Sequence, residues 1–206
     1  MKNIFNTIYL LLIVCILITC NKEITAIIDK KEAKEAFDYL NNIRSNPAAY
    51  SNEIGCDISY VEPRHALVWN EKLASAAERK AMDMAKRNYC EHVDPDGYGM
   101  NYFIHKAGYQ LTDDFLAERS QNNFESIGAG YESGIKLIQG LILDKGYPAG
   151  FEGHRIHLLG IDQFWANCYD IGIGFVSVIN PKDTSSSIVT TNYVTYSCIL
   201  IAKQDY

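Results

Sequence analysis

The 206-residue chain carries 25 acidic and 19 basic side chains, which gives a formal net charge of −6. Binding to nucleic acid requires clustered lysines and arginines, and the densest basic stretch, residues 30–34, is interrupted by Glu32. The composition therefore argues against nucleic acid as a partner. With 48% hydrophobic and 21% charged residues, it is typical of a globular protein that buries a core.

The first residues have the pattern of an export signal. Lys2 supplies a positive end, and an uncharged apolar run then extends from Ile8 to Ile18. This run is shorter than the roughly 20 apolar residues that cross a bilayer, so it is typical of a secretory signal. It ends in Leu-Ile-Thr-Cys, which resembles a bacterial lipobox and predicts a lipoprotein signal peptide over residues 1–19 with lipidation of Cys20. An ordinary signal peptide and a marginal membrane anchor are the alternatives.

Each of these interpretations places the rest of the chain outside the cytoplasm. Acyl chains on Cys20 would anchor the protein to a membrane, in the cell envelope or at the cell surface. We expect residues 20–30 to form a tether and residues 31–206 to form one folded domain.

Hydrophobic spacing and capping residues predict four helices in the first two thirds of the chain. The predicted helices cover residues 30–44, a segment that starts after the N-cap Asn70 and stops before the turn at 94–97, residues 98–107, and a segment from the cap Ser133 to Asp144.

Two strands are predicted to close the chain, at residues 170–179 and 188–202, with a turn at 180–184 between them. Because the helices mostly precede the strands and do not alternate with them, the predicted fold class is α+β, with helices layered on a sheet.

The four cysteines that follow Cys20 suit an oxidising compartment. If the two strands form a hairpin with a turn centred near Asp183, facing residues have numbers that add up to about 366, as 168 and 198 do. This predicts a cross-strand disulfide between Cys168 and Cys198, and Cys56 with Cys90 by elimination. Four reduced, buried thiols are the alternative.

Several ionisable side chains stand in unusual settings. His92 immediately precedes a turn, and Glu125 lies between an aromatic residue and a glycine-rich apolar segment. Asp144 falls at the C-terminal end of a predicted helix, where the helix dipole disfavours a carboxylate. His154 and His157 are spaced to share one side of a helical turn. The alternatives are that His92 is a surface histidine, that Glu125 is an exposed loop carboxylate and that Asp144 is at a solvated helix end.

The order of these segments resembles the CAP superfamily of cysteine-rich secretory proteins, antigen 5 and pathogenesis-related proteins, in a bacterial form. The resemblance covers about residues 33–201 and rests on the ordered set rather than on one motif. The matching segments are Leu40-Asn41-Asn42-Ile43-Arg44, Leu67-Val68-Trp69-Asn70, His92 with Asp96-Gly97, Glu125-Ser126-Ile127-Gly128, Gly153-His154-Arg155, and Ile171-Gly172-Ile173-Gly174-Phe175.

The resemblance implies a CAP-type α-β-α sandwich, with a small antiparallel sheet between helical layers and a surface cleft. The family's cleft carries a His, Glu, Glu, His tetrad, which maps here to His92, Glu125, Asp144 and His154. Two positions depart from the family pattern. Asp144 is shorter than the usual glutamate, and Ser126 stands where asparagine usually follows the first glutamate. His157 receives no role in this mapping.

The resemblance favours a binding or interaction module over an enzyme, with a lipid, a sterol or a protein as partner. Two imidazoles and carboxylates also suit Zn²⁺ or another divalent cation, with His92 and His154 as the candidate ligands. A metal-dependent hydrolase or protease is therefore one alternative. A structural envelope lipoprotein, in which the tetrad only stabilises the fold, is the other. No catalytic residue is assigned, because Ser126 is not a nucleophile without a positioned base.

Overall fold

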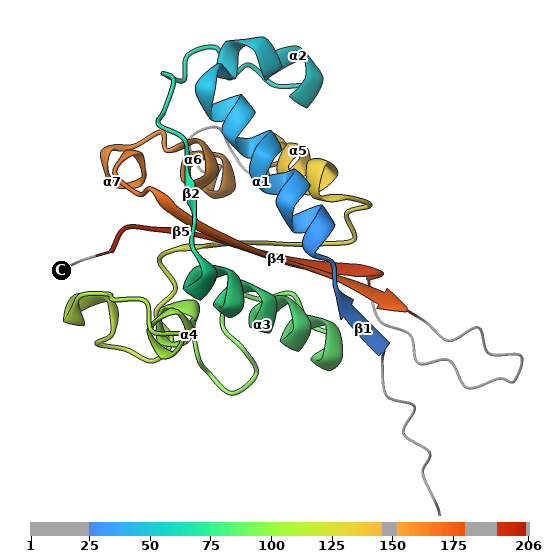
Figure 1. Cartoon of the computed structure of the whole chain (residues 1–206), viewed down its shortest axis with the longest axis vertical. Coiled ribbons are helices and arrows are strands. Elements are labelled where there is room, and N and C mark those ends of the chain that lie inside the picture. The colour runs from blue at the N-terminus through green and yellow to red at the C-terminus, as the bar shows by residue number, and fades with distance from the viewer. Residues whose placement is uncertain (1–24, 146–151, 180–192, 205–206) are drawn as a thin grey trace, which may run out of the picture.

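A five-stranded sheet lies between two groups of helices in the computed structural model, which describes residues 25–145, 152–179 and 193–204 (Figure 1). Helices α1, α5 and α6 pack on one face, and α3 and α4 pack on the other. This confirms the predicted α+β class and the CAP-type α-β-α sandwich. The helices are α1 Lys30–Ser45, α2 Ser51–Ile54, α3 Glu71–Arg87, α4 Met100–Lys106, α5 Gly134–Leu143, α6 Gly153–Leu159 and α7 Gln163–Ala166, with short 3₁₀ turns η1 Pro47–Tyr50 and η2 Asp113–Phe115.

The strands are β1 Thr25–Ile28, β2 Val68–Trp69, β3 Glu125–Ala129, β4 Asp170–Ile179 and β5 Thr195–Ala202. Antiparallel neighbours follow the order β1-β4-β5-β3, and β2 pairs with β4 in parallel. Strand β5 is buried along its whole length, because helices cover both faces of the sheet. The predicted strand at 170–179 is confirmed. The predicted turn at 180–184 and the start of the second strand lie outside the described residues.

Three of the four predicted helix starts are confirmed by their caps, whereas the helix predicted from residue 98 begins at Met100 without a side-chain cap. The Asp29 carboxylate accepts hydrogen bonds from two backbone N–H groups of the first turn of α1, at 3.1 Å each. Asn70 caps α3 in the same way, and Ser133 accepts from Lys136 N at the start of α5. Each cap satisfies backbone donors that a helix start otherwise leaves unpaired.

Helix α3 lies directly against β4 at two glycines. A Cβ added to Gly172 would stand 2.1 Å from Ala74 N, and one added to Gly174 would stand 2.3 Å from Ala77 O. Backbone therefore contacts backbone at these points, which only glycine allows. This close approach fixes α3 on the sheet, and with it the segment after α3 that carries His92.

Alternate residues of β4 and β5 enter two separate cores. One face of the sheet contributes Ile171, Ile173 and Phe175 to a core shared with α1, α5 and α6. The other face contributes residues such as Val176 and Leu200 to a core shared with α3 and α4. Because successive side chains of a strand point to opposite faces of the sheet, both strands contribute to both cores.

The tether predicted for residues 20–30 is wrong from Thr25 onward. Thr25–Ile28 forms β1 and pairs with β4, with Thr25 facing Ile179. The backbone hydrogen bonds that this segment forms with β4 decide its structure, although its mixed polar and apolar composition had predicted a tether. The predicted signal peptide at 1–19 and the lipidated Cys20 lie outside the described residues. Among the residues that are described, no helix has the length and apolar character needed to cross a bilayer.

The predicted pairing of Cys168 with Cys198 is also wrong. The register of β4 and β5 places Cys198 opposite Gly174, six residues further along the chain than Cys168. The two thiols also belong to different cores, on opposite faces of the sheet. Cys56 and Cys90 are divided in the same way, and none of these four cysteines forms a disulfide in the described part of the chain. The structure therefore agrees with the alternative of reduced cysteines.

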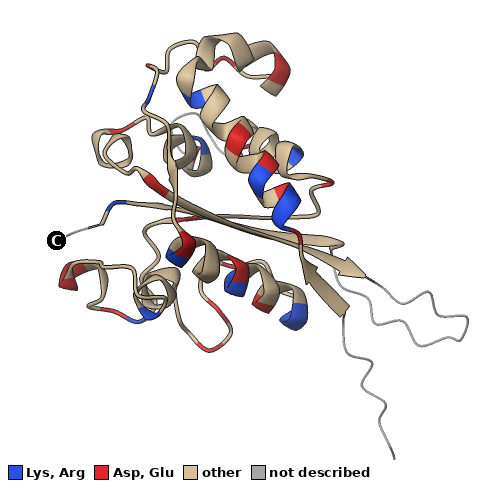
Figure 2. Ribbon diagram, viewed as in Figure 1, with Lys and Arg blue, Asp and Glu red and all other residues tan. Residues whose placement is uncertain are grey.

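Acidic and basic residues are interspersed along α1 and α3 (Figure 2). Several form ion pairs within one helix, such as Lys31 with Glu35 at 2.9 Å. Exposed pairs of this kind contribute roughly 0.3–0.5 kcal/mol each, so these helices are held mainly by their buried faces.

Candidate functional site

The four predicted site residues form two histidine–carboxylate pairs. His92 Nδ1 lies 2.8 Å from Glu125 Oε2, and His154 Nδ1 lies 2.9 Å from Asp144 Oδ1. Because an ionised carboxylate only accepts hydrogen bonds, each Nδ1 is assigned as the donor. The Asn122 amide nitrogen, 3.0 Å from His92 Nδ1, also only donates, so with this assignment it forms no hydrogen bond to the ring. In both pairs the histidine is more exposed than its carboxylate: 49% against 0% in the first, and 23% against 4% in the second.

The carboxylate of Glu125 is held inside the protein at the start of β3. Its Oε2 accepts from His92, and its Oε1 accepts from Cys198 Sγ at 3.5 Å on the neighbouring strand. Burial raises the pKa of the Cys198 thiol, which keeps the donating proton on sulfur. Glu125 is therefore a buried, hydrogen-bonded group and not the exposed loop carboxylate of the alternative interpretation.

Asp144 is the C-cap of α5, where the helix dipole disfavours a carboxylate, and its side chain turns to the start of α6. Its backbone adopts φ 47° and ψ 48°, a left-handed conformation that is uncommon outside glycine, and its N–H donates to Gly140 O at 3.0 Å. The carboxylate then receives both the ring and the backbone N–H of His154, the latter at 3.1 Å. A strained helix end is thus offset by two hydrogen bonds to the start of α6.

Lys80 supports the loop of His92 and was missed by the sequence analysis. It is 2% exposed, and its Nζ donates to Glu91 O at 2.7 Å and to His92 O at 2.9 Å. A signal was present, because Lys80 stands on the apolar face of α3 between Ala77 and Ala81. A lysine is rarely buried without such partners.

A second missed feature connects the two pairs. Ser126 Oγ lies 2.7 Å from His157 Nδ1, with 1% and 3% of the two residues exposed. Burial lowers the pKa of His157 to about 3, so the ring is neutral near pH 7, and it packs 4.4 Å from the Trp165 ring. Ser126 follows Glu125 in β3, and His157 lies one helical turn after His154. The bond therefore joins the strand of one pair to the helix of the other.

The second pair borders a cleft of about 350 Å³ with mixed polar and apolar walls, and Lys145 also lines it. Asp144 and His154 line it beside Ile127, Leu141 and Leu143, whereas His92 and Glu125 do not. The ring of Tyr131 forms one wall, and it fits because a Cβ on Gly140 would lie 2.2 Å from it. Apolar walls with a few fixed polar groups are the usual composition of a ligand site.

The fit to a divalent cation is incomplete. Within residues 25–145, 152–179 and 193–204, no group of three or more His, Cys, Asp or Glu side chains is placed to hold a metal ion. Catalytic zinc sites usually have three protein ligands. Each histidine does hold a carboxylate through Nδ1, as metal-binding histidines often do, which directs Nε2 to an incoming ion. The described residues therefore offer two imidazoles and lack the third ligand.

The three-layer fold and its two histidine–carboxylate pairs define a protein of the CAP type. The chain belongs to the CAP family, described as the cysteine-rich secretory protein family, whose model matches residues 37–194. The match spans all four site residues and confirms the resemblance found in the sequence.

A solved structure has the same fold at low sequence identity. It is the 1.5 Å crystal structure of an extracellular protein that contains an SCP domain, from Bacillus anthracis str. Ames, with 21% identity and a TM-score of 0.52. The alignment covers 85% of this chain and 41% of that one, so this chain spans less than half the length of that protein. The comparison with curated proteins found no match.

Proposed function

We propose that this protein is a lipid-anchored binding module that acts outside the cytoplasm and takes an apolar or amphipathic group into the cleft beside His154 and Asp144. The cleft itself carries the proposal, because it sets an apolar wall beside a charged, hydrogen-bonding wall. A binding role accounts for this composition without requiring a nucleophile or a complete metal site.

Three observations support the location. The first residues have the pattern of a lipoprotein signal ending at Cys20, the family is described as secretory, and the similar SCP-domain protein is described as extracellular. A lipid on Cys20 would hold the domain at the surface of a membrane in the cell envelope. Ligands or partners at that surface would then reach the cleft without crossing the bilayer.

The geometry of the cleft favours one kind of ligand. Ile127, Leu141 and Leu143 provide an apolar wall, and the His154–Asp144 pair provides hydrogen-bonding groups fixed in place. This suits an apolar body with one polar head, such as the end of a sterol or another lipid, or an apolar side chain of a protein partner. A volume of about 350 Å³ admits only part of a large lipid.

Binding to the full chain tests the proposal, with a fluorescent sterol and a fluorescent fatty acid as probes. We expect saturable binding of at least one probe. Ala129→Trp should weaken it at least tenfold, because Ala129 lines the cleft and is only partly buried. Ala117→Trp, at an exposed position outside the cleft, is the matched control. No saturable binding, or equal binding by both variants, would argue against an apolar ligand in this cleft.

A divalent metal remains a second candidate, favoured by the carboxylate held on each Nδ1. Zn²⁺ would be held by His92 and His154 and would polarise a bound water. Calorimetric titration of the full chain with Zn²⁺ and Mg²⁺, beside the His92→Ala/His154→Ala double variant, tests this. Micromolar binding (about −8 kcal/mol) by the wild type alone would support a metal and justify a screen for hydrolase or protease activity. Loss of stability without any change in binding would instead support a structural envelope role for the tetrad.

A further inference from the structure

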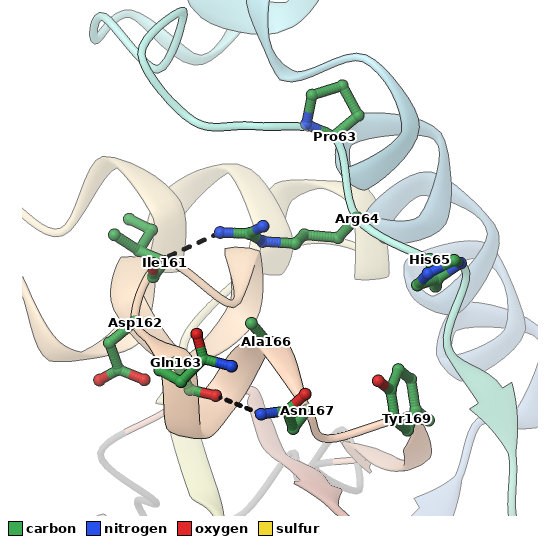
Figure 3. Close-up of a pocket in the computed structure, with 9 residues that line it drawn as sticks. All are labelled: Pro63, Arg64, His65, Ile161, Asp162, Gln163, Ala166, Asn167 and Tyr169. Atoms are coloured by element: carbon green, nitrogen blue, oxygen red, sulfur yellow. Dashed lines mark hydrogen bonds between the residues drawn. The ribbon is translucent and has the colours of Figure 1, made fainter.

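Two hollows that none of the four site residues lines adjoin at Tyr169. The first has about 560 Å³ and lies between Pro63–His65 and the segment 161–167, with His65 and Tyr169 at one end (Figure 3). The second has about 490 Å³ and lies between Asn70 on one side and Lys203 on the other. Asn167 and Tyr169 line both hollows, so the two adjoin at these residues, and together they are called the trough.

The positive and negative charges of the side chains that line the trough balance one another. Arg64 and Asp162 line the first hollow, and Asp170 and Lys203 line the second. Each hollow therefore pairs one cation with one anion, which favours neither a phosphate nor a basic peptide. Most of the remaining lining is polar, which disfavours a lipid. An uncharged ligand rich in hydrogen-bonding groups fits this balance best.

The acceptor groups of the trough are held in fixed orientations. Asp162 Oδ1 accepts from Trp165 N at 2.9 Å, and Asp170 Oδ2 accepts from Tyr109 OH at 2.7 Å. Asn167 Nδ2 donates to Gln163 O at 2.8 Å. In each side chain the second polar atom has no recorded hydrogen bond to any described residue. Three oriented acceptors, Asp162 Oδ2, Asp170 Oδ1 and Asn167 Oδ1, are thus available to a ligand.

Two donors are held in the same way. Arg64 Nε donates to Gly160 O at 2.8 Å and its Nη2 to Ile161 O at 3.4 Å, which leaves Nη1 available. Asn70 uses Oδ1 to cap α3, which leaves its Nδ2. A hydroxyl group both donates and accepts, so a surface that mixes oriented donors and acceptors matches a ligand with many hydroxyls. Fixed side chains also reduce the entropy lost on binding.

Tyr169 supplies the apolar contact that such a ligand needs. Its side chain remains exposed, at 42%, and it meets the edge of His65 with ring centroids 6.3 Å apart. Its backbone oxygen accepts from Val68 N at 2.7 Å where β2 meets β4, which fixes the base of the side chain. The C–H face of a pyranose ring is apolar and can stack on an exposed aromatic ring, while its hydroxyls reach the polar groups around it.

We propose that this trough binds a neutral oligosaccharide, with one sugar unit in each hollow and Tyr169 stacked against the glycan between them. The proposal is independent of the cleft beside His154, since no residue lines both sites. A surface glycan recognised here would add a second contact for a protein that is held near a cell envelope.

Saturation-transfer NMR on the full chain tests the proposal with cellobiose, maltose, lactose and N,N′-diacetylchitobiose as probes. We expect at least one disaccharide to bind with a Kd below about 10 mM. Tyr169→Ala should weaken that binding at least tenfold, and Asn167→Ala several-fold, whereas Tyr169→Phe should retain it. Tyr60→Ala is the matched control, because Tyr60 is 59% exposed and lines neither hollow.

Three results would overturn the proposal. The first is the absence of binding by all four sugars, and the second is binding that Tyr169→Ala leaves unchanged. The third is tighter binding of inorganic phosphate or of a neutral polar peptide such as triserine, which would assign the trough to another ligand class. His154→Ala should leave sugar binding intact, so the outcome is separate from that of the cleft.

Discussion

Ser126 Oγ and His157 Nδ1 lie 2.7 Å apart inside the protein and join β3 to α6. The bond lies next to the candidate site, because Ser126 follows Glu125 in β3 and His157 is one helical turn after His154 in α6. His157 Nδ1 has Ser126 as its hydrogen-bond partner, and the Ile201 backbone also accepts from the ring, which raises its pKa against the larger effect of burial. The relative position of the two histidine–carboxylate pairs therefore depends on a serine that is not the residue usual in the family.

Replacing this serine tests that dependence. We expect Ser126→Ala to destabilise the protein by about 1–3 kcal/mol, because it leaves a buried ring nitrogen without a partner. Denaturant unfolding of the full chain measures the change. Ser75→Ala, at an exposed position of α3, should change the free energy of unfolding by less than about 0.5 kcal/mol. Equal effects of the two substitutions would contradict the role of the Ser126–His157 bond.

Burial of His157 predicts an acid-dependent loss of stability. Its pKa is lowered to about 3 in the folded protein, mainly by burial, whereas an unfolded histidine has a pKa of about 6.5. Between these values the unfolded chain binds a proton that the folded chain does not. The stabilisation is therefore complete above about pH 6.5 and is lost progressively as the pH falls toward 3.

The free energy of unfolding, measured in denaturant between pH 7 and pH 4.5, checks this effect. Other groups titrate in the same range, so the informative quantity is the difference between wild type and His157→Gln. The variant should show a shallower decline with acid. His65→Gln, at an exposed histidine, should decline like the wild type. A slope that His157→Gln leaves unchanged would show that this ring does not control the acid response.

The contact between α3 and β4 predicts that Gly174 tolerates no side chain. A Cβ there would lie 2.3 Å from Ala77 O and must displace the helix, so Gly174→Ala should cost about 3 kcal/mol or more. Gly153→Ala is the control, because nothing lies within 4 Å of a Cβ at that position. Thermal unfolding should show a large fall in Tm for the first variant and little change for the second.

Lys80 should control the order of the His92 loop. Lys80→Met keeps an apolar stem of similar length but removes the hydrogen bonds to Glu91 O and His92 O. Both bonds are partly buried and have a charged donor, so each contributes about 1.5–3 kcal/mol. We expect faster amide hydrogen exchange at residues 91–94, beside an overall loss of stability. Lys86→Met, at an exposed position of the same helix, should change neither. Unchanged exchange in Lys80→Met would mean that the turn at 94–97 orders this loop alone.

Local patterns in the sequence determined the longest helices. Asn70 and Ser133 cap their helices as predicted, because an N-cap needs only its own first turn. The ordered motifs were sufficient to identify the family, and the tetrad residues taken from it do form hydrogen-bonded pairs. These features depend on residues close in sequence or on a pattern carried by the whole chain.

Only the tertiary structure decided how distant segments meet. The register of β4 and β5 depends on pairing along both strands, and it separated Cys168 from Cys198, which a turn position alone had joined. Burial of Glu125 depends on β5 and on the His92 loop, and neither is near it in the chain. Ser126 and His157 are 31 residues apart, and nothing local to either residue predicts their bond. Side-chain partners brought together by packing are set by the shape of the complete core, whereas caps and helical periods are set by the chain within one or two turns.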